Sequence, residues 1–152
     1  MNTYSAEFEN TPTMDEISLP NNADIPPAIP NGDHYQVMLV RAEKKRQYNG
    51  EKLFLWFQLT TPGEWIGEKF YMVCTIAPHG KWTASHKYWQ AWVLAAGKRP
   101  SRKDRLSTKV FENTVFRVRM RVVTKTAKQL LRTPAQQYSV VDELLERMTE
   151  PT

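Results

Sequence analysis

The chain has 152 residues, of which 41% are hydrophobic and 24% are charged, a composition typical of a single globular domain with one core. No apolar run reaches the roughly 18–20 residues of a membrane-spanning helix, and no basic-then-apolar leader opens the sequence. A single cysteine, Cys74, excludes an internal disulfide framework and fits a reducing compartment. We therefore expect a cytoplasmic protein that makes no contact with a membrane.

Charge is distributed in three blocks. Residues 1–30 hold five carboxylates and no Lys or Arg, which gives −5, and residues 142–152 hold four carboxylates and one Arg, which gives −3. The middle block, residues 31–141, holds 20 basic and seven acidic side chains and carries +13. A basic body between acidic ends predicts a polyanionic partner, most often nucleic acid, with charge for solubility alone as the alternative.

The N-terminal block, residues 1–30, contains five prolines and little apolar periodicity, which predicts a disordered acidic arm. Its charge is opposite to that of the body, so we expect it to compete with nucleic acid for the basic groove at low salt. The alternative is a linker or a tail that docks a partner. On the competition hypothesis, deletion of residues 1–30 tightens binding modestly.

Two alternating segments follow, residues 34–44 and 52–60, and predict two strands joined by a hairpin loop with Asn49-Gly50 at its turn. In the second strand every other residue is apolar and is expected to face inward, namely Leu53, Leu55, Phe57 and Leu59. Phe54 and Trp56 then face outward, and Trp56 is expected to protrude and to stack on a base. The alternative is that Trp56 covers the sheet beneath a loop.

Residues 66–77 predict a third strand that sends Lys69 and Tyr71 outward, and a change to helical period follows it. A helix is predicted over residues 82–97, with Gly97 at its end. Its apolar face, which we expect in the core, consists of Trp89, Trp92, Val93 and Ala96.

Residues 115–123 show the most regular alternation in the chain, with apolar side chains on one face and three arginines on the other. These three residues, called the arginine row, are Arg117, Arg119 and Arg121. Residues two apart on a strand are about 6.5–7 Å apart, which is close to the phosphate spacing of an extended single strand. We expect the row to bind phosphates, so that Ala at positions 119 and 121 weakens binding and flattens its salt dependence. A solvated outer face is the alternative.

The last part of the chain predicts a long basic loop over residues 124–137, a fifth strand over 138–141, and a short helix or acidic tail after it. The expected organisation is a disordered arm (1–30), one folded domain (31–142) and a C-terminal tail or short helix (143–152). The predicted order of elements is therefore strand, strand, strand, helix, strand, strand.

This order matches a mainly-β fold, a five-stranded Greek-key barrel of the oligonucleotide-binding (OB) type with one helix between strands three and four. Such barrels hold nucleic acid on strands two and three, between the loops that join strands one to two and four to five. We predict that the nucleic-acid-binding residues are Lys44, Lys45, Arg46, Tyr48, Phe54, Trp56, Lys69, Tyr71, Arg117, Arg119, Arg121, Lys125, Lys128 and Arg132.

Four stretches of the chain resemble the small OB-fold single-stranded-DNA-binding proteins of phages and plasmids. They are Pro30-x-Gly32-x-x-Tyr35, Tyr48-Asn49-Gly50, Trp92-Val93-Leu94-Ala95-Ala96-Gly97 and Tyr138-Ser139-Val140-Val141-Asp142. The resemblance is one of pattern and spacing over most of residues 30–142. It implies largely sequence-independent binding of unpaired DNA during replication or recombination.

No catalytic constellation is recognised in the sequence. The three histidines lie in no triad context and, together with Cys74, lack the paired spacing of a zinc site. Asp33 and Glu43-x-Lys45 formally resemble a nuclease metal motif, but on one strand they would lie roughly 33 Å apart. We therefore expect a protein that is not an enzyme and needs no metal or cofactor.

Two other functions are compatible with the same features. Stacking and cationic grooves do not by themselves distinguish DNA from RNA, so an RNA-binding OB module is one alternative. A protein-interaction adaptor in a larger nucleoprotein complex is the other. Replication or recombination proteins and a second copy of the chain are further candidate partners.

Overall fold

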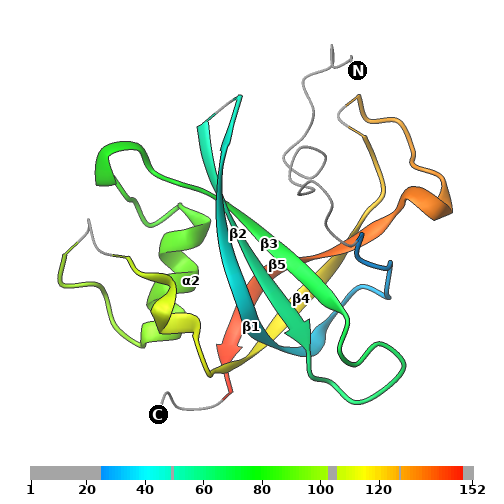
Figure 1. Cartoon of the computed structure of the whole chain (residues 1–152), viewed down its shortest axis with the longest axis horizontal. Helices are drawn as coiled ribbons and strands as arrows, with labels where there is room; N and C mark the ends of the chain where they lie inside the picture. The colour runs from blue at the N-terminus through cyan, green and yellow to red at the C-terminus, as the bar shows by residue number, and fades with distance from the viewer. Residues whose placement is uncertain (1–24, 49, 103–105, 127, 149–152) are drawn as a thin grey trace.

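The structure is a computed structural model, and it describes residues 25–48, 50–102, 106–126 and 128–148. Five antiparallel strands form one sheet in the order β3-β2-β1-β4-β5 (Figure 1). The strands are β1 (Gly32–Gln47), β2 (Gly50–Leu59), β3 (Lys69–Thr75), β4 (Val115–Val123) and β5 (Tyr138–Arg147). The α-helix α2 (Lys87–Ala96) lies between β3 and β4, and the 3-10 turns are η1 (Pro78–Gly80), η2 (Thr108–Phe111) and η3 (Pro134–Gln136). The prediction of a mainly-β fold with a helix between the third and fourth strands is confirmed.

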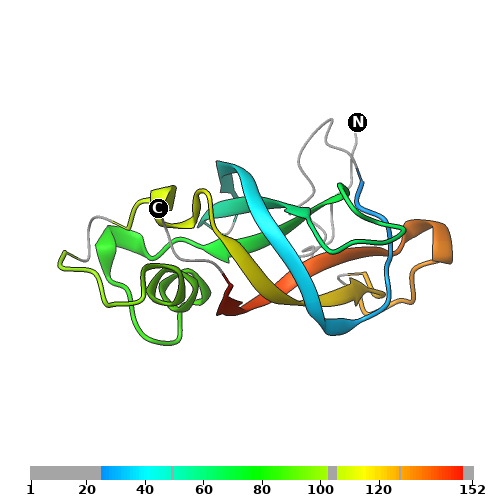
Figure 2. The same cartoon turned by 90° about the horizontal axis from the view of Figure 1, so that it is seen from below.

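Most apolar side chains belong to one large cluster, the inner core, around which the sheet curls (Figure 2). Alternation decides which residues enter it. The four inward residues predicted for β2 all lie in this cluster, as do Phe116, Val118 and Met120 of β4. Helix α2 packs beside β3 and β5 at one end of the core. The predicted faces of β2 and β4 are thus confirmed, except that Val122 of β4 is half-buried and does not join the inner core.

Helix α2 begins at Lys87, so the predicted helix over residues 82–97 started too early. Gly97 ends it as predicted, with φ of 75° and with its N–H donating to Val93 O at 2.8 Å. The buried residues of the helix are Tyr88, Ala91, Trp92 and Ala95. Of the predicted core face only Trp92 is therefore buried, whereas Trp89, Val93 and Ala96 are half-buried against the inner core. In the part of the chain that the structure describes, no helix combines the length and the apolar character that a membrane crossing requires.

Strand β1 contains a β-bulge that changes which face its side chains occupy. Leu39 stands opposite Phe57 on the side of the inner core, whereas Arg41 stands opposite Trp56 on the other side. The extra residue between them is Val40, which is exposed. Because of this one residue, Arg41 shares a face with Trp56 instead of pointing into the core.

The prediction of a disordered arm over residues 1–30 is wrong for its last six residues. Ile29 is 2% exposed and belongs to the inner core. Ser139 N donates to Pro27 O at 3.0 Å, and Ile29 N donates to Ser139 Oγ at 2.9 Å, so this segment lies along the start of β5. Residues 1–24 lie outside the described residues. The folded domain therefore begins before the predicted boundary at residue 31.

The predicted helix or tail after residue 142 is also wrong, because β5 continues to Arg147. Glu143 and Glu146, which are good helix formers, stand opposite Arg119 and Arg117 of β4. Cross-strand pairing therefore overrides the local preference. Arg147 Nη1 donates to Ala95 O at 2.9 Å and ties the end of β5 to α2.

The sheet has two edge strands, β3 and β5. Its curl brings these edges toward each other, since the rings of Tyr71 and Tyr138 lie 6.3 Å apart between their centroids. The remaining strand bounds differ from prediction by a few residues: β1 and β2 start earlier than expected, and β3 is shorter than residues 66–77 because turns precede it.

Candidate nucleic-acid interface

A second buried cluster lies on the face of the sheet that points away from the inner core. We call it the aromatic face, and it consists of Phe54, Trp56, Tyr71, Val73, Val123, Tyr138 and Val140. Strand alternation places it there, because Trp56 stands opposite Tyr71 and both neighbours of Trp56 in the chain belong to the inner core. The rings of Trp56 and Tyr71 meet edge to face at 5.1 Å. Phe54, Trp56 and Tyr71, which were predicted to share one face, are thus brought together.

The prediction that Trp56 protrudes into solvent is wrong. Its exposed fraction is 1%, and those of Phe54 and Tyr71 are 0%. The direction of the side chain was predicted correctly, but the face on which it lies is itself packed. Any ligand that stacks on these rings must therefore displace the groups that now cover them.

Cationic side chains lie over the rings of this face. The guanidinium of Arg41 is 4.8 Å from the centroid of Trp56, and Lys45 Nζ is 6.0 Å from that of Phe54. From the β4–β5 connection, the guanidinium of Arg132 is 5.5 Å from the ring of Tyr138. Cation–π contacts hold these charges close to the aromatic surface, where an anionic ligand would meet both at once.

Lys52 lies at the end of the same face, and sequence reasoning did not select it. It is 3% exposed, and its Nζ donates to Thr75 Oγ1 at 3.0 Å. Burial lowers the pKa of this ammonium from 10.5. A buried ammonium whose hydrogen-bond partner is a neutral hydroxyl attracts an anion, since a counter-charge would offset the loss of its hydration.

Two polar atoms of this face are buried without a hydrogen-bond partner among the described residues. They are the indole Nε1 of Trp56, a donor, and the carboxylate Oε1 of Glu43, an acceptor. Glu43 stands opposite Phe54, so both atoms belong to the same surface. A buried unpaired donor or acceptor costs about 1–3 kcal/mol. A ligand with both kinds of group, such as a nucleobase edge, would remove this penalty.

The arginine row lies on β4 as predicted, but each of its members is paired with a carboxylate of β5. Arg117 and Arg121 make ion pairs of 3.0 Å with Glu146 and Asp142, and Arg119 pairs with Glu143. These contacts offset the positive charge on which the phosphate-binding prediction depended. The cations closest to the aromatic rings are instead those of β1 and of the β4–β5 connection.

The β1–β2 hairpin separates the predicted binding residues between two faces. Lys45 stands opposite Lys52 on the aromatic face. Lys44 stands opposite Leu53 and faces the other side, and Arg46 is 3.9 Å from Glu51. The structure therefore does not bring Lys44 and Arg46 to the aromatic face, because they have the opposite strand parity. At the tip, Tyr48 is 87% exposed.

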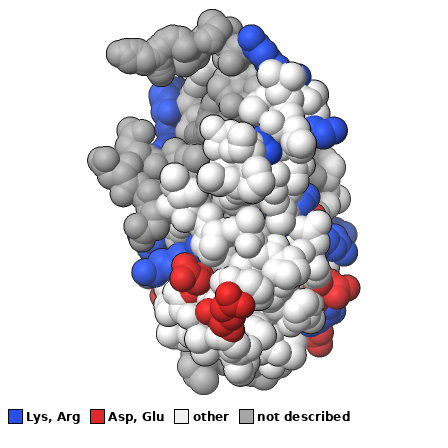
Figure 3. Space-filling view, turned by 90° about the vertical axis from the view of Figure 1, so that its right-hand side faces the viewer, with Lys and Arg blue, Asp and Glu red and all other residues white. Residues whose placement is uncertain are grey.

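The β4–β5 connection forms the other border of the face. It is a loop as predicted, with a bridge between Lys125 and Leu131 and a hydrogen bond of 3.2 Å from Arg132 Nε to Lys125 O. Lys128, Leu130 and Leu131 are exposed. Seen from this end of the molecule, Lys and Arg occupy the upper part and margins of the surface, and Asp and Glu gather toward its lower end (Figure 3). Lys69, the other predicted cation, is exposed at the start of β3.

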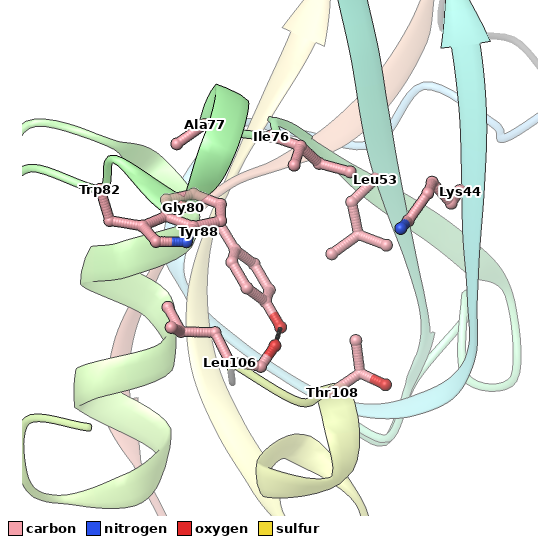
Figure 4. Close-up of a pocket in the computed structure, with 9 residues that line it drawn as sticks. All are labelled: Lys44, Leu53, Ile76, Ala77, Gly80, Trp82, Tyr88, Leu106 and Thr108. Carbon is pink, nitrogen blue, oxygen red and sulfur yellow. Dashed lines mark hydrogen bonds between the residues drawn. The ribbon is translucent and has the colours of Figure 1, made fainter. Parts of the chain in front are cut away.

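A separate hollow of about 310 Å³ lies between the β1–β2 hairpin and α2 (Figure 4). Trp82 and Tyr88 line one side of it and Lys44 lies across from them. The hydroxyl of Tyr88 donates to Leu106 O at 2.6 Å and is therefore already satisfied. The hollow offers few polar groups to a ligand and lies on the opposite side of the sheet from the aromatic face.

Sequence reasoning missed Arg41, Lys52 and Tyr138 as members of the site. Lys52 follows the same alternation as Phe54 and Trp56, so parity alone would have found it. Arg41 could not be found this way, since the bulge before it leaves no mark in the sequence. Within the described ranges, no group of three or more His, Cys, Asp or Glu side chains is arranged to hold a metal ion.

Comparison with protein-family models, with curated proteins and with solved structures gives no match. The function is therefore argued from the residues of the site.

Proposed function

We propose that this protein binds single-stranded DNA, largely independently of sequence, through the aromatic face. The observation that carries the proposal is the cluster of Phe54, Trp56 and Tyr71 with Arg41 and Lys45 over its rings. Bases stack on aromatic side chains at about 1–3 kcal/mol each, and cations beside them bind the backbone. Both features lie on one surface of this protein.

The strand order supports the proposal that the sheet is an OB-type barrel. In such a barrel the strands of order β3-β2-β1-β4-β5 close by bringing β3 and β5 together, and Tyr71 and Tyr138 approach each other across these two edges. The nucleic-acid face of an OB barrel lies on strands two and three, between the loops after strands one and four. The aromatic face includes Trp56 of β2 and Tyr71 of β3, and Tyr48 and Arg132 lie in the β1–β2 and β4–β5 connections, which supports the proposal. By the resemblance stated above, the process served is replication or recombination of phage or plasmid DNA.

Competition binding tests this proposal. A fluorescent single-stranded DNA of about 16 nucleotides, the upper end of what one OB fold covers, is titrated with the protein and then displaced by unlabelled DNA, RNA or duplex of equal length. We expect single-stranded DNA to displace the probe best and duplex to displace it least. Equal displacement by RNA would favour the RNA-binding module, and absence of probe binding at low salt would contradict nucleic-acid binding altogether.

A further inference from the structure

The point at which the chain enters the folded domain lies next to the aromatic face. The hydrogen bonds of Pro27 and Ile29 to Ser139 fix this segment beside the start of β5, and Tyr138, the preceding residue, belongs to the aromatic face. Ile25 is 68% exposed. The described chain therefore begins at the border of this face, and 24 residues precede Ile25 in the sequence. An extended chain spans about 3.3 Å per residue, so this segment is long enough to cross the whole face.

The aromatic face requires particular properties of anything that covers it. Its rings are at most 1% exposed, so a segment that docks here displaces the groups that cover them and must offer an equivalent apolar surface. The cations Arg41, Lys45 and Lys52 attract an anion. The indole N–H of Trp56 needs a hydrogen-bond acceptor. A covering group must therefore combine apolar or aromatic surface with negative charge and acceptor atoms.

Residues 1–24 have this chemistry. They contain Glu7, Glu9, Asp15, Glu16 and Asp24 and no Lys, Arg or His. Tyr4 and Phe8 supply aromatic rings, and Phe8 stands directly between two of the carboxylates. Rings in alternation with anions are also what an unpaired nucleic-acid strand presents, as bases and phosphates.

We propose that the acidic segment 1–24 docks on the aromatic face of its own chain and occupies the surface that single-stranded nucleic acid would use. Phe8 packs among the rings of Phe54, Trp56 and Tyr71, and the flanking carboxylates pair with the cations over them. Nucleic acid and the segment then exclude each other. The exclusion rests on the proposed function, whereas the docking does not.

A paramagnetic label on the segment tests the docking in the full-length chain. A nitroxide is attached to an Asn10→Cys variant at neutral pH, where the native Cys74 does not react because it is fully buried and burial raises the pKa of its thiol to about 12. The indole N–H signals of the five tryptophans are then compared, with that of Trp56 assigned from a Trp56→Phe variant. We expect selective broadening of the Trp56 signal, with those of Trp82 and Trp92, which pack in the inner core, much less affected.

Matched variants identify the contacts. Phe8→Ala and the double variant Glu7→Gln/Glu9→Gln should each reduce the broadening, whereas Thr13→Ala, which changes neither charge nor ring, should not. About 1 M salt should also reduce it, because charge pairs are screened. Unbroadened Trp56 at low salt would overturn the proposal. Broadening that appears only when labelled and isotope-enriched chains are mixed would also overturn it, since the occupant would then be a second copy.

Addition of single-stranded DNA separates this inference from the proposed function. If DNA restores the Trp56 signal, both the docking and the exclusion are supported. If the signal stays broadened although DNA is in excess, the docking stands and the exclusion fails. If DNA binds while no broadening was ever present, nucleic-acid binding stands and the docking is wrong.

Discussion

Trp56 and Trp92 are two tryptophans of this domain that differ little in exposure, at 1% and 9%, yet they lie in different surroundings. In the inner core, the indole Nε1 of Trp92 donates to Ser107 O at 3.0 Å. On the aromatic face, the indole Nε1 of Trp56 has no acceptor among the described residues, and a guanidinium lies over its ring. Both indoles are thus buried, but only the indole N–H of Trp92, in the inner core, has a hydrogen-bond acceptor. This contrast supports the proposal that the aromatic face is a binding surface.

The largest expected difference between the two clusters concerns stability and is tested on adjacent residues of β2. Phe57→Ala removes an inner-core ring that packs 6.4 Å from Phe116 and should lower the free energy of unfolding by about 3–5 kcal/mol. Trp56→Ala also removes a buried ring, but it removes with it an indole N–H that lacks an acceptor, and this relief of about 1–3 kcal/mol offsets part of the roughly 3–5 kcal/mol loss expected for a buried aromatic residue. Urea denaturation of both variants measures the difference. A larger loss for Trp56→Ala would make the aromatic face part of the structural core.

Ile29 gives a second test of where the structural core ends. Ile29→Ala should cost about 2–5 kcal/mol, because the side chain is fully buried and its cavity cannot collapse completely. Ile25→Ala is the matched control four residues earlier, and its exposed side chain predicts a change within about 0.5 kcal/mol. Thermal and urea unfolding compare the two. Equal effects of the two substitutions on stability would contradict the placement of residues 25–30. Variants that delete the N-terminal segment should therefore keep residue 25 and all that follows.

Trp56→Ala should also weaken the binding of single-stranded DNA, by about 1–3 kcal/mol, at a nearly unchanged salt slope, because stacking releases no counterions. Trp92→Phe, which keeps a ring in the inner core, is the control and should leave the affinity unchanged. Fluorescence anisotropy at several salt concentrations measures both quantities. Normal affinity of Trp56→Ala would remove the aromatic face from the proposed site.

The two clusters should also respond to pH in opposite directions. Burial raises the pKa of Cys74, in the inner core, from 9.0 to about 12. Above pH 9 the unfolded state therefore loses this proton first, and stability falls by about 2 kcal/mol by about pH 10.5, at 1.36 kcal/mol per pKa unit. Burial lowers the pKa of Lys52, so just below pH 10.5 the unfolded state binds the extra proton and this residue makes stability rise with pH.

Substitutions separate these contributions. Cys74→Val should flatten the alkaline loss of stability, and Lys52→Met should make it steeper, in urea unfolding followed between about pH 8 and pH 10.5. If Lys52→Met leaves the pH dependence as it was, the ammonium of Lys52 is hydrated and the aromatic face is open at that end.

The smallest expected effects distinguish the cations of the aromatic face from the arginine row. Arg41→Gln/Lys45→Gln should reduce the salt slope of DNA binding by roughly one unit per lost phosphate contact, that is by about two. Arg117→Gln/Arg119→Gln should change it by less than one, because these guanidinium groups already have carboxylate partners. Stability should change by about 0–1 kcal/mol per exposed ion pair. If Arg117→Gln/Arg119→Gln reduced the salt slope more than Arg41→Gln/Lys45→Gln, the arginine row would be part of the binding site.

The sequence predicted the strands and their faces wherever alternation was unbroken. Phe57 and Trp56 were assigned to opposite faces correctly, because a period of two leaves no other arrangement. The bulge before Arg41 was not predictable, since an extra residue in a strand depends on its partner strand and not on local preference. For that reason Arg41 was missed, whereas Lys45 and Arg132, which were predicted as binding residues, do lie over the rings.

Two further errors arose where long-range contacts override composition. The prolines around Ile29 indicated disorder, but hydrogen bonds to Ser139, 110 residues away in the chain, fix this segment in the fold. Residues 142–147 resemble a helix in composition, but they form part of β5 because their carboxylates pair with the arginines of the neighbouring strand β4. Burial of Trp56 could not be predicted either, because alternation gives the direction of a side chain and not what lies above it.

The attachment of the chain beside Ser139 has a kinetic and thermodynamic consequence. A random coil of 24 residues attached there would have a root-mean-square length of about 25–30 Å, which would keep its acidic residues within the dimensions of the domain. Such tethering corresponds to an effective concentration in the millimolar range. A contact too weak to be detected between separate molecules would therefore occupy the aromatic face for much of the time. A short oligonucleotide would have to exceed that local concentration, whereas a long strand that engages several protein molecules side by side would displace each segment more easily.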